Sequence, residues 1–137
     1  MTKDPFRPVD DAARAMARSL IAKARHGALA VLQAGAPMVS RVALAPEAAA
    51  LTTLVSDLAP HTQALRGADI ASLLIGEPGK GDPLAHPRIT LQVRPEFTAK
   101  TEDAARAYLE KQPKAQLYIG FGDFHLVRLT PVEAHLN

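Results

Sequence analysis

The sequence predicts a mainly β fold, an antiparallel barrel with helices packed on its outside. Five or six strand-like segments outnumber the helical ones, and short turns join most of them. The regular crossover helices that a doubly wound parallel sheet needs are missing. With 137 residues the chain suffices for one hydrophobic core, so we expect a single domain over residues 1–137.

The first half of the chain predicts one helix and three strands. Residues 9–25 repeat apolar side chains at helical spacing after two aspartates, which suit the start of a helix dipole. We expect this amphipathic helix to pack on the barrel. Two segments, "ALAVLQ" (28–33) and "MVSRVALA" (38–45), predict a β-hairpin around "AGAP", and "LTTLVS" (51–56) predicts the third strand.

The second half predicts three more strands, separated by a short helix, a loop and a longer helix. In chain order these are the helix 60–65, the strand 69–76, the loop 76–87, the strand 88–97, the helix 101–112 and a last strand from Asp123. The loop holds three glycines and three prolines, which interrupt strand pairing. Thr101 suits the N-cap position of the helix 101–112, and Pro113 ends that helix.

Composition excludes several classes of function. The formal net charge is only +2, the basic residues are scattered and aromatic residues make up 4%, which argues against nucleic-acid binding. The absence of cysteine excludes disulfides and thiolate zinc sites. No apolar run approaches the length of a membrane span, and the start "MTKDPFRPVDD" lacks the apolar core of a secretory signal. We therefore expect a cytoplasmic protein that does not insert into membranes.

The histidines do not predict a metal site. No two of them are four residues apart, the spacing that places two ligands on one helix face. We expect each to be exposed or satisfied by a neighbour. They are His26, His61, His86, His125 and His135.

One stretch combines a strand end, hydroxyl groups, an imidazole and a helix start: "LTTLVSDLAPHTQAL", residues 51–65. Pro60 suits the first helical position, which would leave the N–H groups of His61 and Thr62 unpaired. A bound phosphate would accept those donors, together with the Thr62 hydroxyl and the His61 ring. In the alternative, Ser56, Asp57 and Thr62 cap the turn and satisfy its own backbone. The residues alone leave both interpretations open.

A second group of polar residues follows the loop. Arg88 heads the polar face of the strand 88–97, together with Thr90 and Gln92, and its forked guanidinium suits a phosphate. The alternative is a solvated edge strand. Asp123, between Gly122 and Phe124, is either a functional carboxylate or an ordinary strand-start turn residue. No nucleophile elbow or Walker A loop is present.

These segments together resemble the pyridoxamine 5′-phosphate oxidase-like, FMN-binding split-barrel superfamily, and within it the branch that includes haem-utilisation proteins. The similarity runs from about Arg25 to Asn137. Its most distinctive pieces are "SDLAPHTQALR", "GDPLAHPRITL" and "GDFHLVRL". The resemblance implies a six-stranded split barrel that works as a homodimer, with two flavin sites in the clefts between subunits.

The resemblance also implies which residues contact the flavin. The second strand would run beside the flavin, and Ser56 would lie near its ribityl chain or ring. His61 and Thr62 fall where oxidase members grip the phosphate with an arginine and a lysine, and Arg88 falls where they place another flavin-contacting polar residue. The implied cofactor-binding residues are Ser40, Arg41, Val42, Ala43, Ser56, His61, Thr62 and Arg88.

We therefore expect a homodimeric FMN-binding protein, an oxidoreductase acting on a small molecule, whose hydride or electron chemistry the flavin supplies. A haem-binding or haem-degrading protein that uses the same cleft without flavin is the alternative. A third is a non-catalytic flavin carrier or a split barrel that has lost its cofactor. Two departures bear on this choice. The His61–Thr62 pair carries less charge than an arginine and a lysine, which implies a weaker grip on phosphate. Asp123 falls where haem-utilisation relatives keep an acidic residue, but the sequence lacks the C-terminal extension that holds the iron ligand of haem-degrading members.

Overall fold

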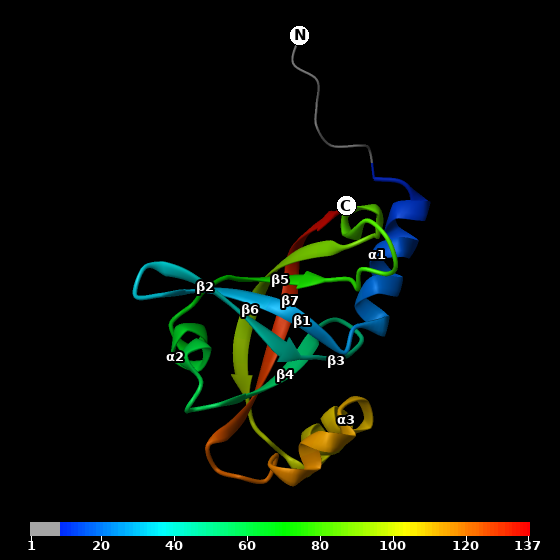
Figure 1. The fold of residues 1–137 in the computed structure, drawn as a ribbon. Coiled ribbons are helices and arrows are strands. Elements are labelled where there is room, and N and C mark those ends of the chain that lie inside the picture. Colours follow the sequence, from blue (N-terminus) through cyan, green and yellow to red (C-terminus); the bar gives the residue numbers. More distant parts are fainter. Residues whose placement is uncertain (1–8) are drawn as a thin grey trace.

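The computed structural model describes residues 9–137, and Figure 1 shows them as one strongly bent antiparallel sheet with helices at its periphery. The strands are β1 (His26–Gln33), β2 (Ala36–Ala43), β3 (Ala45–Pro46), β4 (Leu51–Ser56), β5 (Ala71–Ile75), β6 (Ile89–Thr98) and β7 (Phe124–Leu136). The helices are α1 (Asp11–Lys23), α2 (Pro60–Arg66) and α3 (Glu102–Lys111), with 3₁₀ turns η1 (Pro83–Ala85) and η2 (Pro113–Leu117). Residues 1–8, which include most of the segment considered as a secretory signal, lie outside the described residues.

The fold class is confirmed, with one strand more than the six expected. The described strands pair in the order β2-β1-β5-β6-β7-β4-β3, and every pair is antiparallel. The extra strand comes from the segment 38–45, expected as one strand. β2 pairs with β1 only as far as Ala43, and after Leu44 the chain continues as β3, where Ala45 pairs with Thr52 of β4.

Alternate side chains of the strands fill the interior. Leu29, Leu73 and Leu91 have no exposed surface and lie in register across β1, β5 and β6. Each fully buried leucine of this kind contributes roughly 1.5–3 kcal/mol to stability. The period of two that predicts the strands therefore also defines the core.

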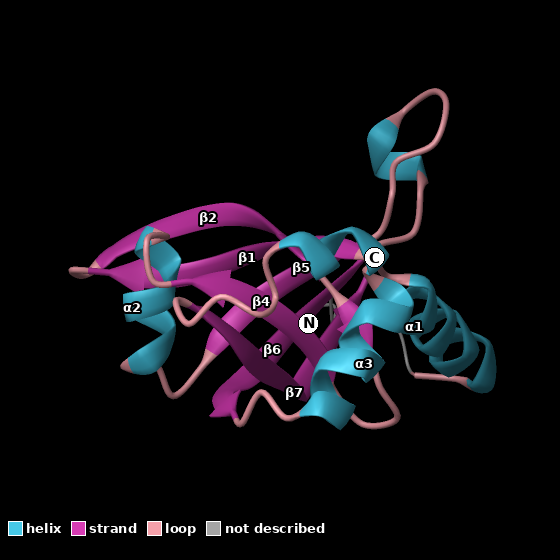
Figure 2. Ribbon diagram, turned by 90° about the horizontal axis from the view of Figure 1, so that it is seen from below, coloured by secondary structure: helices cyan, strands magenta, loops and turns pink. Residues whose placement is uncertain are grey.

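The helices begin where their capping residues predict. The Asp10 carboxylate accepts the Ala13 N–H at 2.7 Å, and the Thr101 hydroxyl accepts the Ala104 N–H at 3.1 Å. In both views α1 and α2 lie on opposite sides of the barrel (Figures 1 and 2). α1 rests on the core through partly buried residues such as Leu20. Within residues 9–137, no helix combines the length and the apolarity that crossing a bilayer requires.

The barrel is split between β2 and β4. β2 is an edge strand, and no strand ladder joins it to β4 among the described residues. Instead the buried Thr53 of β4 donates its hydroxyl hydrogen bond to the Ala43 carbonyl of β2, at 2.7 Å. The backbone N–H and C=O groups along the outer edge of β2 therefore have no partner strand among the described residues.

The outer face of the sheet is partly apolar and uncovered in the single chain. Register places Val39, Ala30 and Ser72 in one row across β2, β1 and β5, and Arg41, Ala28 and Leu74 in the next. Val39 is 65% exposed and Leu74 is 44% exposed. Ala28 and Ala30 lie between them, and their small side chains leave this face of the sheet without tall projections.

Candidate functional site

The candidate site lies at the split, between β2 and the turn that connects β4 to α2. Ser40 of β2 and His61 of α2 meet there, with Ser40 Oγ 3.1 Å from His61 Nδ1. Both are partly buried. The structure thus brings together residues of the expected second strand and of the expected phosphate-binding segment.

The turn itself uses most of the donors that the sequence offered to a phosphate. The Ser56 carbonyl accepts the Ala59 N–H at 3.0 Å and also the Thr62 hydroxyl, while the Ser56 hydroxyl accepts the Leu58 N–H at 3.1 Å. The Thr62 N–H donates to the Ala59 carbonyl at 3.1 Å, and Thr62 has no exposed surface. The expected role of Thr62 as a phosphate donor is therefore corrected, because both of its donors are used within the turn. The capping alternative describes this residue.

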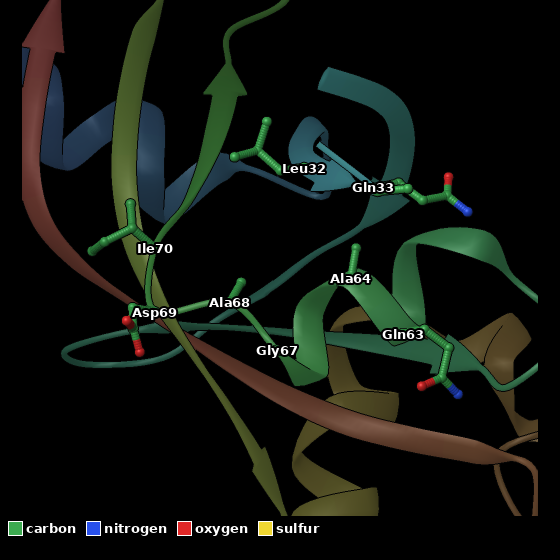
Figure 3. A pocket seen from close by; sticks show the side chains of 9 residues that line it. Leu32, Gln33, Gln63, Ala64, Gly67, Ala68, Asp69 and Ile70 are labelled. Carbon is green, nitrogen blue, oxygen red and sulfur yellow. The ribbon is translucent and has the colours of Figure 1, made fainter. Parts of the chain in front are cut away.

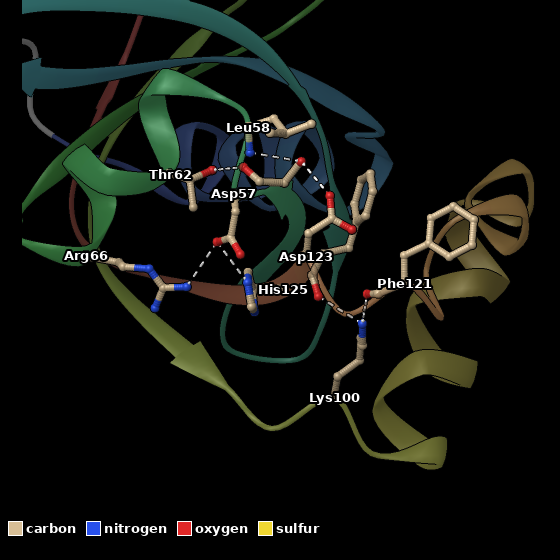
Figure 4. Close-up of polar contacts among 10 residues, drawn as sticks. Asp57, Leu58, Thr62, Arg66, Lys100, Phe121, Asp123 and His125 are labelled. Carbon is tan, nitrogen blue, oxygen red and sulfur yellow. Dashed lines mark hydrogen bonds and ion pairs between the residues drawn. The ribbon is translucent and has the colours of Figure 1, made fainter.

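An ion-pair group fixes the turn to β7 (Figure 4). Asp57 Oδ1 lies 2.9 Å from the buried His125 Nε2 and 3.4 Å from an Arg66 nitrogen. The His125 ring N–H is not aligned with that oxygen for a hydrogen bond, so the contact is an ion pair when the ring is protonated. The His125 contact, followed by Arg66, holds the pKa of Asp57 below its ordinary value, against an opposing effect of burial. Arg66 also lies over the Phe97 ring, 4.2 Å from its centre.

Asp123 belongs to the same anchoring group. Its carboxylate accepts the Ser56 hydroxyl at 3.3 Å, and its carbonyl accepts the Asp57 N–H at 2.8 Å. Close by, the Lys100 ammonium donates to the Phe121 and Phe124 carbonyls, each at 2.8 Å (Figure 4). The sequence does not predict these contacts, because they join positions far apart in the chain and no local pattern indicates them.

The His61 ring uses only its Nδ1 nitrogen for a hydrogen bond within residues 9–137. Burial lowers the pKa of its imidazole. When Nδ1 accepts the Ser40 hydroxyl, the proton of the neutral ring lies on Nε2. Among residues 9–137 this Nε2 has no hydrogen-bond partner. It can donate to an anion or bind a group in the split.

The other expected cofactor residues fall into two places. Arg41 and Val42 continue β2 from Ser40, with Arg41 exposed and in no ion pair with residues 9–137, and Val42 buried. Arg88 lies elsewhere. It precedes the first residue of β6, whereas Ser56 aligns through Phe124 with the far end of that strand. Its guanidinium donates hydrogen bonds to the Leu84 and His86 carbonyls. Within a single chain, Arg88 therefore does not lie at the split.

Two hollows border this region. The first, about 500 Å³, lies between α2 and the tip of the β1–β2 hairpin and includes Leu32, Gln33, Gln63 and Ala64 (Figure 3). The second, about 730 Å³, lies between the end of α1 and the outer face of the sheet, beside Arg41. Neither includes His61 or Ser40, so the polar pair rather than a deep cavity defines the candidate site within one chain.

Solved structures with this fold include proteins of related sequence. A haem-binding protein from Mycobacterium smegmatis is 31% identical, with TM-score 0.82 over 96% of this chain and 55% of its own. A protein of unknown function from Agrobacterium tumefaciens is 26% identical, with TM-score 0.85 over 99% of this chain and 61% of its own. This chain thus spans little more than half the length of either protein.

A candidate pyridoxamine 5′-phosphate oxidase from Listeria innocua is 13% identical and superposes with TM-score 0.71 over 89% of this chain and 95% of its own. The chain therefore has the split-barrel fold of pyridoxamine 5′-phosphate oxidase-like proteins, as the resemblance implies. Among the other split-barrel neighbours are a haem storage protein and a FAD-binding protein, both below 25% identity and similar in fold alone. No protein-family model and no curated protein matches the sequence.

Proposed function

We propose that this split-barrel protein binds the phosphate of FMN at the His61–Ser40 pair and acts as a flavin-dependent oxidoreductase on a small molecule. The observation that carries the proposal is the free Nε2 of His61, held by Ser40 beside the unpaired edge of β2. A bound flavin would supply the hydride or electron chemistry. The protein would bind and orient it.

The chain's own residues divide that task. His61 Nε2 would donate to a phosphate oxygen, and the edge of β2 from Ser40 to Ala43 would contact the flavin through the backbone groups that Thr53 leaves unused. Arg41 would add charge from the outer side of β2. Thr62 and Ser56 would support the site from behind, by fixing the turn that carries His61. No residue of the split is assigned to proton transfer.

We propose a homodimer formed through the outer face of the sheet. Val39 and Leu74 are exposed there beside small residues, which allow two sheets to approach closely. In such a dimer Arg88 would reach a flavin only across the subunit boundary. Val39→Glu should produce a monomer in sedimentation velocity, whereas Leu58→Glu, at an 87% exposed leucine on the turn, should leave the dimer intact. An unchanged dimer in Val39→Glu would place the interface elsewhere.

The decisive experiment is a titration of the purified protein with FMN, followed by flavin fluorescence. His61→Ala should weaken binding roughly 10- to 100-fold, because a hydrogen bond to a charged group contributes about 1.5–3 kcal/mol. His86→Ala is the matched control, since His86 lies in the loop between β5 and β6 and contacts the Lys80 carbonyl. Equal FMN affinity in His61→Ala and the native protein would reject the phosphate assignment.

Haem is the second candidate ligand. It is favoured by one observation, the 31% identity to a haem-binding protein. The same protein sample titrated with haemin should show a stoichiometric shift of the Soret band if haem is the ligand. Stoichiometric haemin binding without FMN binding would replace the flavin proposal, and binding of neither would favour a split barrel without a cofactor.

A further inference from the structure

His61 is the histidine in residues 9–137 that keeps Nε2 open. In each of the others Nε2 faces an acceptor: Glu77 for His26, the Lys80 carbonyl for His86, Asp57 for His125 and Glu133 for His135. His61 is held through its other nitrogen, by a serine hydroxyl and not by a carboxylate. Because the serine is neutral, the charge of the His61 ring depends on the group that binds at Nε2.

The surroundings of His61 disfavour protonation of the ring in the absence of a ligand. Within residues 9–137 no charged or titratable side chain of the adjoining elements forms an ion pair with His61. These side chains are His26 on β1, Arg41 on β2, Asp57 before α2, Arg66 on α2, and Arg94 and Glu96 on β6. Asp57 and Arg66 pair with each other, and Arg41 is on the opposite face of β2 from Ser40 by strand alternation. Partial burial without an acidic partner lowers the pKa of His61.

Ser40 suits both charge states of the ring. A serine hydroxyl donates to the unprotonated Nδ1 of a neutral imidazole, and by rotating it accepts from the protonated Nδ1 of an imidazolium. The contact of 3.1 Å can therefore persist when the ring gains a proton. Ser40 is in this sense a positioning residue for His61.

We propose that this protein takes up the phosphate of its flavin together with a proton on His61, so that FMN is held more tightly on the acid side of neutrality. The inference rests on the proposed function. A phosphate dianion at Nε2 stabilises the imidazolium, and the ring then donates from both nitrogens, to phosphate and to Ser40. The proton comes from solvent and returns to it on release.

The sign of the effect follows from linkage. Binding raises the pKa of a ring whose pKa is lowered in the free protein, so FMN affinity falls as pH rises between the two values. The slope cannot exceed about tenfold per pH unit for one proton. At lower pH the phosphate itself protonates, with a pKa near 6, which ends the gain.

The test compares FMN with riboflavin, which lacks the phosphate, in fluorescence titrations between pH about 6 and about 8. FMN affinity of the native protein should fall up to about tenfold per pH unit within this range, and riboflavin affinity should stay level. His61→Gln, which keeps a donor but cannot protonate, should bind FMN with no such slope, and His86→Gln should behave as the native protein. The ring-proton NMR shifts of His61 should report a higher pKa with FMN than without.

Three outcomes are distinct. FMN binding with a slope that persists in His61→Gln, or that riboflavin shares, would overturn the proton coupling and leave the proposed function in place. A level FMN affinity in the native protein would do the same. No FMN binding at any pH would reject the proposed function, and the coupling with it.

Discussion

On its β7 side the turn between β4 and α2 is held by several polar contacts, whereas on its β2 side the His61–Ser40 pair is the polar contact that ties α2 to the strand. The β7 side joins Ser56 and Asp57 to Asp123 and His125. We call these the anchored side and the open side. A binding site needs a fixed backbone to position its groups. It also needs groups whose hydrogen-bond partners can change when a ligand binds.

The largest effect is expected inside the anchored turn, at Thr62. Thr62→Val keeps the shape of the side chain but removes the donor to the Ser56 carbonyl, in a residue without exposed surface. We expect a loss of about 1–3 kcal/mol in the free energy of unfolding, measured by urea denaturation. Thr62→Ser keeps the hydroxyl and should recover part of that loss.

Thr90→Val is the matched control for this substitution. Thr90 is partly buried on β6 and forms no hydrogen bond through its hydroxyl within residues 9–137. The free energy of unfolding of Thr90→Val should fall by less than about 0.5 kcal/mol, because the substitution removes no hydrogen bond within the protein. Equal losses for the two valine variants would mean that the Thr62 hydroxyl does not hold the turn.

A smaller effect is expected at the outer end of the anchored side. Lys100→Met leaves the Phe121 and Phe124 carbonyls without their ammonium donor and should cost about 1–2 kcal/mol, since water replaces part of the interaction. Hydrogen exchange should also become faster in the segment 118–124. Lys114→Met, at an exposed lysine, is the control and should change neither measurement. Unchanged exchange in Lys100→Met would show that the ring contacts of Phe124 with Tyr118 and Phe121, and not the ammonium, hold this loop.

The two sides also differ in how far the sequence could predict them. The strands follow from a period of two, and the start of α3 follows from Thr101 as N-cap, because both depend on neighbouring residues. The Asp57–His125 contact depends on the register between β4 and β7, which pairs Val55 with His125. No local pattern encodes that register, so the sequence predicts the capping of the turn as an alternative but does not predict its contacts with β7.

The open side was predicted in part, through family resemblance. Ser40 and His61 were both named as cofactor residues, but their direct contact was not expected. The helix start alone leaves Thr62 as either a ligand donor or a capping residue, and the resemblance favours the ligand. The structure shows that a turn this short uses such donors itself, first through the Ala59 carbonyl and then through that of Ser56.

On the open side we expect a weaker dependence of stability on the polar pair. Ser40→Ala removes the partner of His61 Nδ1, but water reaches both partly exposed groups and replaces the bond. The free energy of unfolding should fall by about 0.5 kcal/mol, well below the loss in Thr62→Val. Urea denaturation of the two variants side by side checks the order. A larger loss in Ser40→Ala than in Thr62→Val would reverse the distinction between the sides.

The smallest effect is expected from the charge of Asp57, which water screens because the carboxylate is exposed. Its folded-state pKa lies below the ordinary value of 3.8, so its contribution to stability is present above that value and is lost as pH falls through the folded pKa. Asp57→Asn should therefore differ from the native protein in urea midpoint near neutral pH, and the difference should shrink in acid. Asp69→Asn, at an exposed aspartate before β5, should show no pH-dependent difference. A difference for Asp57→Asn that is equal at both pH values would mean that its ion pairs with His125 and Arg66 do not stabilise the turn. The hydrogen bonds that Asp123 accepts from the Ser56 hydroxyl and the Asp57 N–H would then hold the anchored side.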